Sequence, residues 1–241
     1  MFGFIWHTIF FDPVYNGLVF FIDVIPGGDV GLAIICITIL VKTILLPLSI
    51  KATKTQVVIK EIEPKLKALK EKITDRQEQA RAMMDLYKEA GINPFASILL
   101  MFLQIPILIG LYFAVSKGGG VPLPDINTTL LYSFVPNPEV VNMIFLGVQD
   151  ITAKSLPIAL VAGVAQFVQA SMTIPKPAPR VEGETPSMKE EFTRNMQMQM
   201  RYVMPLLIFF IAYTLSAAIA IYFTVSALMA IGQEYVVKRY R

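Results

Sequence analysis

Residues 31–50 read GLAIICITILVKTILLPLSI, an apolar run of 20 residues with a single charged side chain, Lys42. A bilayer core about 30 Å thick needs about 20 helical residues, so this run can span a membrane as one helix. Soluble domains carry about 25% charged residues, whereas this chain of 241 residues is 16% charged and 55% hydrophobic. The run and the composition exclude an ordinary soluble enzyme and predict an all-α protein that crosses the membrane several times.

Three more apolar runs predict four further spans, because the last run is divided into two. The last apolar stretch, Tyr202–Val237, is too long for one span and rather short for two, and we divide it at Ser216. The five predicted spans are residues 29–50, 95–116, 155–173, 202–215 and 217–237.

The basic residues orient these spans. With five spans, all but Lys42, Lys117 and Lys154 of the 21 Lys and Arg residues fall on one side. The positive-inside rule makes that side the cytoplasm. The N-terminus is then outside and the C-terminus inside. The connections are a cytoplasmic segment (51–94), an outer loop (117–154), a cytoplasmic loop (174–201) and a cytoplasmic tail (238–241).

The N-terminal segment, residues 1–28, is apolar but interrupted by two Asp and two Pro residues, and it has no Lys or Arg. Asp12 can cap a helix that has Pro13 at its first position. We therefore expect a helix over residues 13–25 that lies in the outer interface of the membrane. The alternative is a sixth span.

The cytoplasmic segment, residues 51–94, alternates charged residues with apolar ones at helical spacing, which predicts an antiparallel helical hairpin. Pro64 begins or kinks its first arm. Thr74 with Gln77, or Asp75 with Glu78, can form the capping box that begins the second arm.

Polar side chains within the spans are the candidate functional residues. Lys42 lies about 16 Å along the helix from Gly31, near the middle of the bilayer, and Gln104 lies at a similar depth in the second span. Gln166 and Gln169 are three residues apart, so they share one face of the third span. A buried charge requires water or an anion. The four residues therefore predict a wet cavity open to the cytoplasm. Alternatively, each glutamine only bonds to a neighbouring helix.

Catalytic chemistry has no basis in this sequence. Cys36 and His7 are the single cysteine and the single histidine, whereas metal sites and catalytic triads need clustered ligands or a base beside a nucleophile. A GxxxxGK[ST] loop is also missing, so bound ATP is not expected to drive the protein. We expect no catalytic residues, no metal, no cofactor and no enzymatic activity.

Several strings, in their order and spacing, resemble the YidC/Oxa/Alb family of membrane protein insertases. They cover nearly the whole chain and begin with the run from Asp12 to Gln56. The others are EIEPKLKALKEK, LYKEAGINPFASILLMFLQIPILIGLYFAV, QFVQASMT and MQMQMRYVMPLLIFF. The likeness is to the short bacterial type without a large outer domain, and it implies a multi-pass protein of the bacterial plasma membrane.

The resemblance implies that the protein inserts newly made membrane proteins and helps them fold. Their polar tails would enter a hydrophilic groove in the inner leaflet, lined by Lys42, Gln104, Gln166 and Gln169. Lys42 stands where arginine is commoner in the family. Nascent membrane proteins and the lipid bilayer are the implied partners, with the Sec translocon and the ribosome as further candidates and no sequence-specific nucleic acid. The alternative from another class is a small ion channel or transporter that uses the same polar residues.

Overall fold

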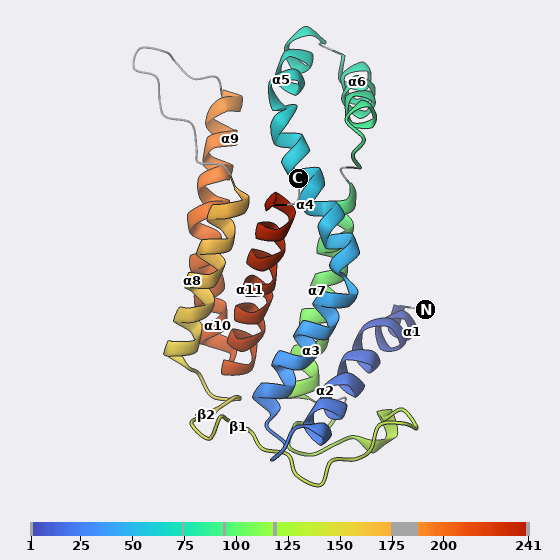
Figure 1. The fold of residues 1–241 in the computed structure, drawn as a ribbon, viewed down its shortest axis with the longest axis vertical. Helices are drawn as coiled ribbons and strands as arrows, with labels where there is room; N and C mark the ends of the chain where they lie inside the picture. Colours follow the sequence, from blue (N-terminus) through green and yellow to red (C-terminus); the bar gives the residue numbers. More distant parts are fainter. Residues whose placement is uncertain (1, 74, 94, 118–119, 175–187, 240–241) are drawn as a thin grey trace. The chain divides into compact units, whose positions relative to one another are not determined.

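The computed structural model describes residues 2–73, 75–93, 95–117, 120–174 and 188–239. It is mostly helical, as the sequence predicts (Figure 1). The chain divides into two compact units. The first consists of Met1–Lys42 and Pro106–Tyr235, and the second of Thr43–Ile105 and Val236–Arg241.

The first unit begins with one unbroken helical run, made of α1 (Phe2–Ile5), the π-helix η1 (Trp6–Phe11) and α2 (Asp12–Val24). α2 agrees with the expected helix over residues 13–25 to within one residue, but Asp12 has helical angles, φ −62° and ψ −42°, so the expected cap at this residue is wrong. The π-helix η1 lies directly before Pro13. Because proline has no N–H to donate, the regular α-helical hydrogen bonds are interrupted at this point. The Asp12 carboxylate accepts a hydrogen bond from the His7 ring instead of capping the helix.

The rest of the first unit is a set of mostly apolar helices with a long loop at one end (Figure 1). The loop contains a 3-10 turn, η2 (Thr128–Leu130), and a two-stranded antiparallel hairpin, β1 (Ile144–Phe145) and β2 (Gln149–Asp150). The helices are α3 (Val30–Ile44), the second half of α7 (Phe95–Ser116), α8 (Leu156–Thr173), α9 (Met188–Met198), the π-helix η3 (Gln199–Val203), α10 (Met204–Leu215) and α11 (Ala217–Arg239).

Two apolar clusters hold the first unit together. The larger joins α2, α3, α7, α11 and the loop around residues such as Tyr15, Ile34 and Tyr222. The smaller joins α8, α10 and α11 through four buried alanines, Ala159, Ala162, Ala212 and Ala220. Small residues let membrane helices approach closely. At Gly163 of α8, a Cβ atom would lie 2.9 Å from the Cβ of Phe209 in α10.

The second unit contains α4 (Leu46–Glu61), α5 (Glu63–Lys72), α6 (Arg76–Glu89) and the first half of α7. α5 and α6 pack against each other as the two arms of a hairpin. Pro64 lies in the first turn of α5. Asp75 caps α6, because its Oδ1 accepts hydrogen bonds from the N–H groups of Gln77 (2.8 Å) and Glu78 (2.9 Å). Thr74, the other candidate cap, lies outside the described residues.

The first predicted span, residues 29–50, is not one straight helix. It breaks at Leu45 into α3 and α4. Pro47 explains the break, because it lacks the N–H that would bond to Thr43 and its ring clashes with that carbonyl group. The depth of Lys42 in the membrane can therefore be estimated by counting residues from the start of α3. It cannot be estimated from Lys51, because no continuous helix joins the two lysines.

Several helices are long and apolar enough to cross a membrane. In the described residues four pass alone, Gly3–Val24, Leu156–Thr173, Arg194–Leu215 and Ala217–Val237, and the bent pair Val30–Ile44 and Leu46–Ile59 makes a fifth if it counts as one span. Phe102–Ser116 is a shorter apolar helix. The run ending at Leu215 has 22 residues and begins before residue 202, because helix-forming Met and Gln residues precede α10. α10 and α11 meet at Ser216, where the backbone is extended.

Candidate functional site

Lys42 lies in the last turn of α3 and is half-buried. Throughout the described part of the chain, no hydrogen bond or ion pair engages its ammonium group. One turn earlier, the buried Thr38 hydroxyl donates to the carbonyl of Ile34 at 2.6 Å. The proton of the Thr38 hydroxyl is therefore used within α3.

Gln166 and Gln169 are half-buried on α8. They follow the buried Ala159 and Ala162 at helical spacing, so they continue the face of α8 that packs inside the first unit. The exposed apolar residues of the helix occupy other positions, namely Leu156, Leu160, Val161, Val164, Phe167 and Val168. The glutamines thus lie on the packed side of α8.

The structure does not bring all the predicted site residues together. No hydrogen bond joins Lys42 to Gln166 or Gln169 within the described residues. Gln104 is half-buried on α7 but belongs to the second unit.

A buried carboxylate lies at the end of the glutamine face. The Thr173 hydroxyl is 2.5 Å from Oε2 of Glu234, which is 5% exposed, and 3.0 Å from the carbonyl oxygen of Gln169. Thr173 follows Gln169 by four residues, so it continues the same line along α8. Glu234 and Thr173 therefore connect α11 to the helix that carries the glutamines.

Arg201 is a second buried charge at this end of α8, which sequence reasoning missed. It is 8% exposed, and its Nη1 donates to the carbonyl oxygen of Ile174 at 2.6 Å. From the sequence it was only one of the charges that orient the chain. The available signal was its position between Met200 and Tyr202, at the start of an apolar run.

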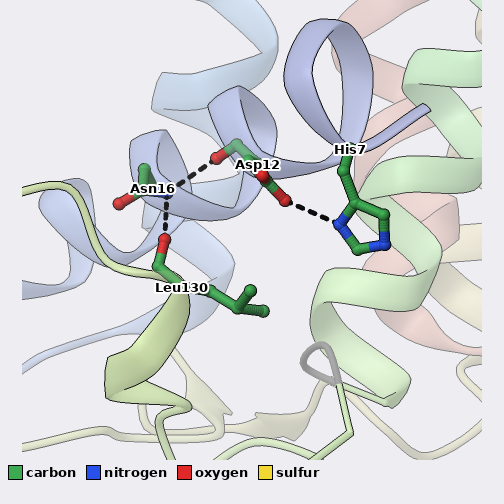
Figure 2. Close-up of polar contacts among 4 residues, drawn as sticks. All are labelled: His7, Asp12, Asn16 and Leu130. Atoms are coloured by element: carbon green, nitrogen blue, oxygen red, sulfur yellow. Dashed lines mark hydrogen bonds and ion pairs between the residues drawn. The ribbon is translucent and has the colours of Figure 1, made fainter. Parts of the chain in front are cut away.

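A polar network lies near the other end of the first unit (Figure 2). His7 Nδ1 is 2.9 Å from Asp12 Oδ1. Asn16, 2% exposed, donates to the carbonyl oxygens of Asp12 and Leu130, both at 2.9 Å. Its Oδ1 accepts from the N–H of Tyr132 at 2.6 Å. Asn16 thus fastens the loop to α2, a role that an amide in an apolar helical run could have indicated.

The comparisons with known proteins agree on one family. The 60Kd inner membrane protein family matches residues 21–241. A relative from Clostridium tetani, named membrane protein insertase YidC, is 31% identical over 89% of this chain and 84% of its own length. Membrane protein insertase MisCA of Bacillus subtilis is 29% identical over 92% of this chain and 75% of its own length.

A solved structure supports the fold. A crystal structure of an active YidC insertase, with its first transmembrane domain resolved, superposes with a TM-score of 0.52 and 22% sequence identity. The match covers 92% of this chain and 46% of the solved chain. At this identity the likeness concerns the fold alone.

Proposed function

The chain belongs to the YidC/Oxa/Alb family, the family of the 60Kd inner membrane protein, and is a membrane protein insertase; from this premise we propose that Lys42, Gln166 and Gln169 of the first unit line the path for the polar part of an inserted protein. We further propose, from the sequence, that Gln104 of the second unit contacts this polar part. In this proposal the path is a hydrophilic groove in the inner leaflet, open to the cytoplasm. The acidic groups of a new membrane protein are attracted to Lys42 while its apolar segment enters the lipid.

The observation that carries the proposal is the unpaired charge of Lys42. The ammonium group is half-buried in an apolar helix, and the described residues provide it with no counter-charge. Charges inside membrane spans are costly and require water or an anion. An acidic substrate tail supplies the anion, and a wet groove lowers the cost of moving that tail through the bilayer.

Gln166 and Gln169 support the same path, because they lie on the packed face of α8. Amide side chains can exchange hydrogen bonds with a passing polar chain at little net cost. The relatives' names favour an insertase and not the channel or transporter of the alternative hypothesis.

We extend the proposal to topology and partners. The protein is a multi-pass membrane protein of a family found in the bacterial inner membrane. We infer that the N-terminus is outside and the C-terminus in the cytoplasm, because the basic residues then concentrate inside. Residues 1–28 form the outer interfacial segment in this arrangement, and 51–94 form the cytoplasmic hairpin. Nascent membrane proteins are the substrates, and the Sec translocon and the ribosome are candidate partners.

Insertion into proteoliposomes tests the role of Lys42. The substrate is a single-span protein with an acidic translocated tail, tested with wild type, Lys42→Ala and Lys42→Arg. We expect about tenfold less insertion with the alanine variant, equivalent to about 1.4 kcal/mol, and near wild-type insertion with the arginine variant. Lys54→Ala, which removes an exposed lysine of α4, is the matched control.

Substrate charge provides the second arm of this experiment. A substrate whose acidic tail residues are replaced by Asn and Gln should respond little to Lys42→Ala. Equal insertion of the acidic substrate by all three proteins would refute the role of the charge. Solute flux through vesicles that support no insertion would favour the channel alternative.

A further inference from the structure

The β1–β2 hairpin ends in an apolar turn. Phe145 pairs with Gln149, so Leu146, Gly147 and Val148 form the tip. The N–H of Val148 donates to the carbonyl of Phe145 at 3.0 Å. Leu146 and Gly147 both have positive φ, 52° and 72°. Such turns favour Gly, Asn and Asp, because a side chain at positive φ costs about 1–2 kcal/mol. Leucine is therefore an unfavourable choice for the backbone at this turn.

One side of the hairpin is fixed to the start of α3. The buried Asp29 carboxylate accepts hydrogen bonds from the N–H of Leu32 in α3, at 3.0 Å, and from the N–H of Leu146, at 2.8 Å. The Phe145 ring packs directly on Gly31, where a Cβ atom would have no room. The tip is thus held against the helix end and cannot turn its side chains inward without breaking these contacts.

The other side is fixed to the start of α11. The carbonyl oxygens of Ile151 and Ala153 accept hydrogen bonds from the N–H groups of Ala218 and Ala217, both at 2.9 Å. α8 begins immediately afterwards, with Ser155 as its N-terminal flanking residue. The hairpin therefore lies at the level where three apolar helices, α3, α8 and α11, all begin. For helices that cross a bilayer, this is the level of the membrane boundary.

The tip nevertheless presents apolar side chains to the surroundings. Val148 is 87% exposed and Leu146 is 62% exposed. The exposed Leu156 and Leu160 of α8 begin just beyond the hairpin, so the apolar surface of the tip is continuous in sequence with the outward face of a spanning helix. Burying such side chains in an apolar phase contributes about 1.5–3 kcal/mol each.

We propose that the tip of the hairpin, Leu146–Val148, inserts into the lipid headgroup–acyl boundary at this end of the protein. The occupant is a lipid surface, because the tip lies at the membrane boundary and adjoins the lipid-facing side of α8. Insertion offsets the backbone cost of leucine at positive φ, and it anchors the loop at a fixed depth beside the helix ends. This inference rests on the spanning helices and not on the insertase mechanism.

Site-specific fluorescence tests the proposal. The single native cysteine, Cys36, is replaced by Ala, and Leu146→Cys and Val148→Cys are each labelled with the environment-sensitive dye NBD in the full-length protein. The exposed Asp125→Cys, in the same loop, is the aqueous control. The labelled proteins are reconstituted into phosphatidylcholine vesicles and exposed to lipid-attached nitroxide or to aqueous iodide.

We expect both tip probes to be quenched at least about twofold more by a nitroxide placed near the headgroups than the Asp125 probe, as burial of about 5–10 Å requires. Iodide should show the opposite order. A tip probe that iodide quenches as strongly as it quenches the control overturns the proposal. Protection from both quenchers also overturns it, because a protein and not lipid would then cover the tip. The use of two tip positions guards against one variant that fails to fold.

Discussion

The Thr173 hydroxyl lies 2.5 Å from a carboxylate oxygen of Glu234, so a short hydrogen bond joins the end of α8 to α11. The same hydroxyl is 3.0 Å from the Gln169 carbonyl oxygen, and its one hydrogen can serve either acceptor. The bond ties the helix that carries Gln166 and Gln169 to its neighbour, which makes it a determinant of where those glutamines lie.

Removing the Thr173 hydroxyl should loosen this end of α8. Thr173→Val keeps the shape of the side chain but cannot donate, and hydrogen bonds between membrane helices contribute about 0.6–1.7 kcal/mol. We expect a lower Tm in detergent for Thr173→Val and a near wild-type Tm for Thr173→Ser, which retains the donor. A valine variant with the wild-type Tm would contradict this role of the hydroxyl, whereas a destabilised serine variant would show that the methyl group of Thr173 contributes as well.

Enlarging Gly163 should disturb the contact between α8 and α10. The new Cβ of Gly163→Ala would lie 2.9 Å from the Phe209 Cβ, so one helix must shift. Overpacking of this kind costs about 1–3 kcal/mol. The matched control is Gly232→Ala in α11, where no atom beyond the nearby backbone of the same helix lies within 4 Å of the added Cβ. Thermal unfolding of the two variants should differ accordingly, and equal Tm values would contradict the close approach.

Replacing Asn16 should release the loop from α2. Asn16→Leu keeps a similar volume but removes the hydrogen bonds to Leu130 and Tyr132, and unsatisfied buried backbone groups cost about 1–3 kcal/mol. We expect faster limited proteolysis within residues 120–142 and a lower Tm. Asn137→Leu, at an exposed position of the same loop, should leave both measurements unchanged. Unaltered proteolysis of Asn16→Leu would show that other contacts hold the loop.

Acid should weaken the turn that follows the hairpin. Hydrogen bonds from the Thr152 hydroxyl and from the Thr152 N–H hold the pKa of Asp150 below its ordinary value of 3.8. Since the pKa is lower in the folded state, the charged carboxylate stabilises the fold above about pH 4, and this contribution is lost as the pH falls through the lowered pKa.

Hydrogen exchange measures this effect. Amides of residues 144–153 should lose protection as the pH falls below about 4, after correction for intrinsic exchange, and Asp150→Asn should remove most of that pH dependence. Asp125→Asn, which changes an exposed carboxylate of the same loop, is the control. A pH profile unchanged by Asp150→Asn would assign the acid sensitivity to another group.

The sequence predicted the class of fold because hydrophobic run length and helix rise are simple physical constraints. It also identified Ser216 as the break between α10 and α11, since no single span is as long as Tyr202–Val237. Lys42 is a candidate from the sequence alone because a single charge in an apolar run is evident without structural context, and its role stays a prediction.

Other features depend on contacts between distant segments. Asp12 satisfies the local rule for a helix cap, but the helix continues through it and its carboxylate bonds to His7. The helix breaks at Leu45 because of Pro47. The predicted span of residues 29–50 rests on its length and apolar composition and does not take this proline into account. Arg201 is buried because the Ile174 carbonyl accepts its hydrogen bond, and that pairing cannot be read from either segment alone.

α8 is tied to α11 near both of its ends, through Ala153 and Ala217 at one end and through Thr173 and Glu234 at the other. Between the two ties, about 27 Å apart for a helix of this length, the packed faces of α8, α10 and α11 meet through small alanine side chains. Both ends of α8 are therefore fixed, and only its middle is held by side-chain packing alone. While both hydrogen bonds persist, α8 cannot rotate away from α11 as a rigid body. Any widening of the space beside Gln166 and Gln169 then requires the middle of α8 to bend.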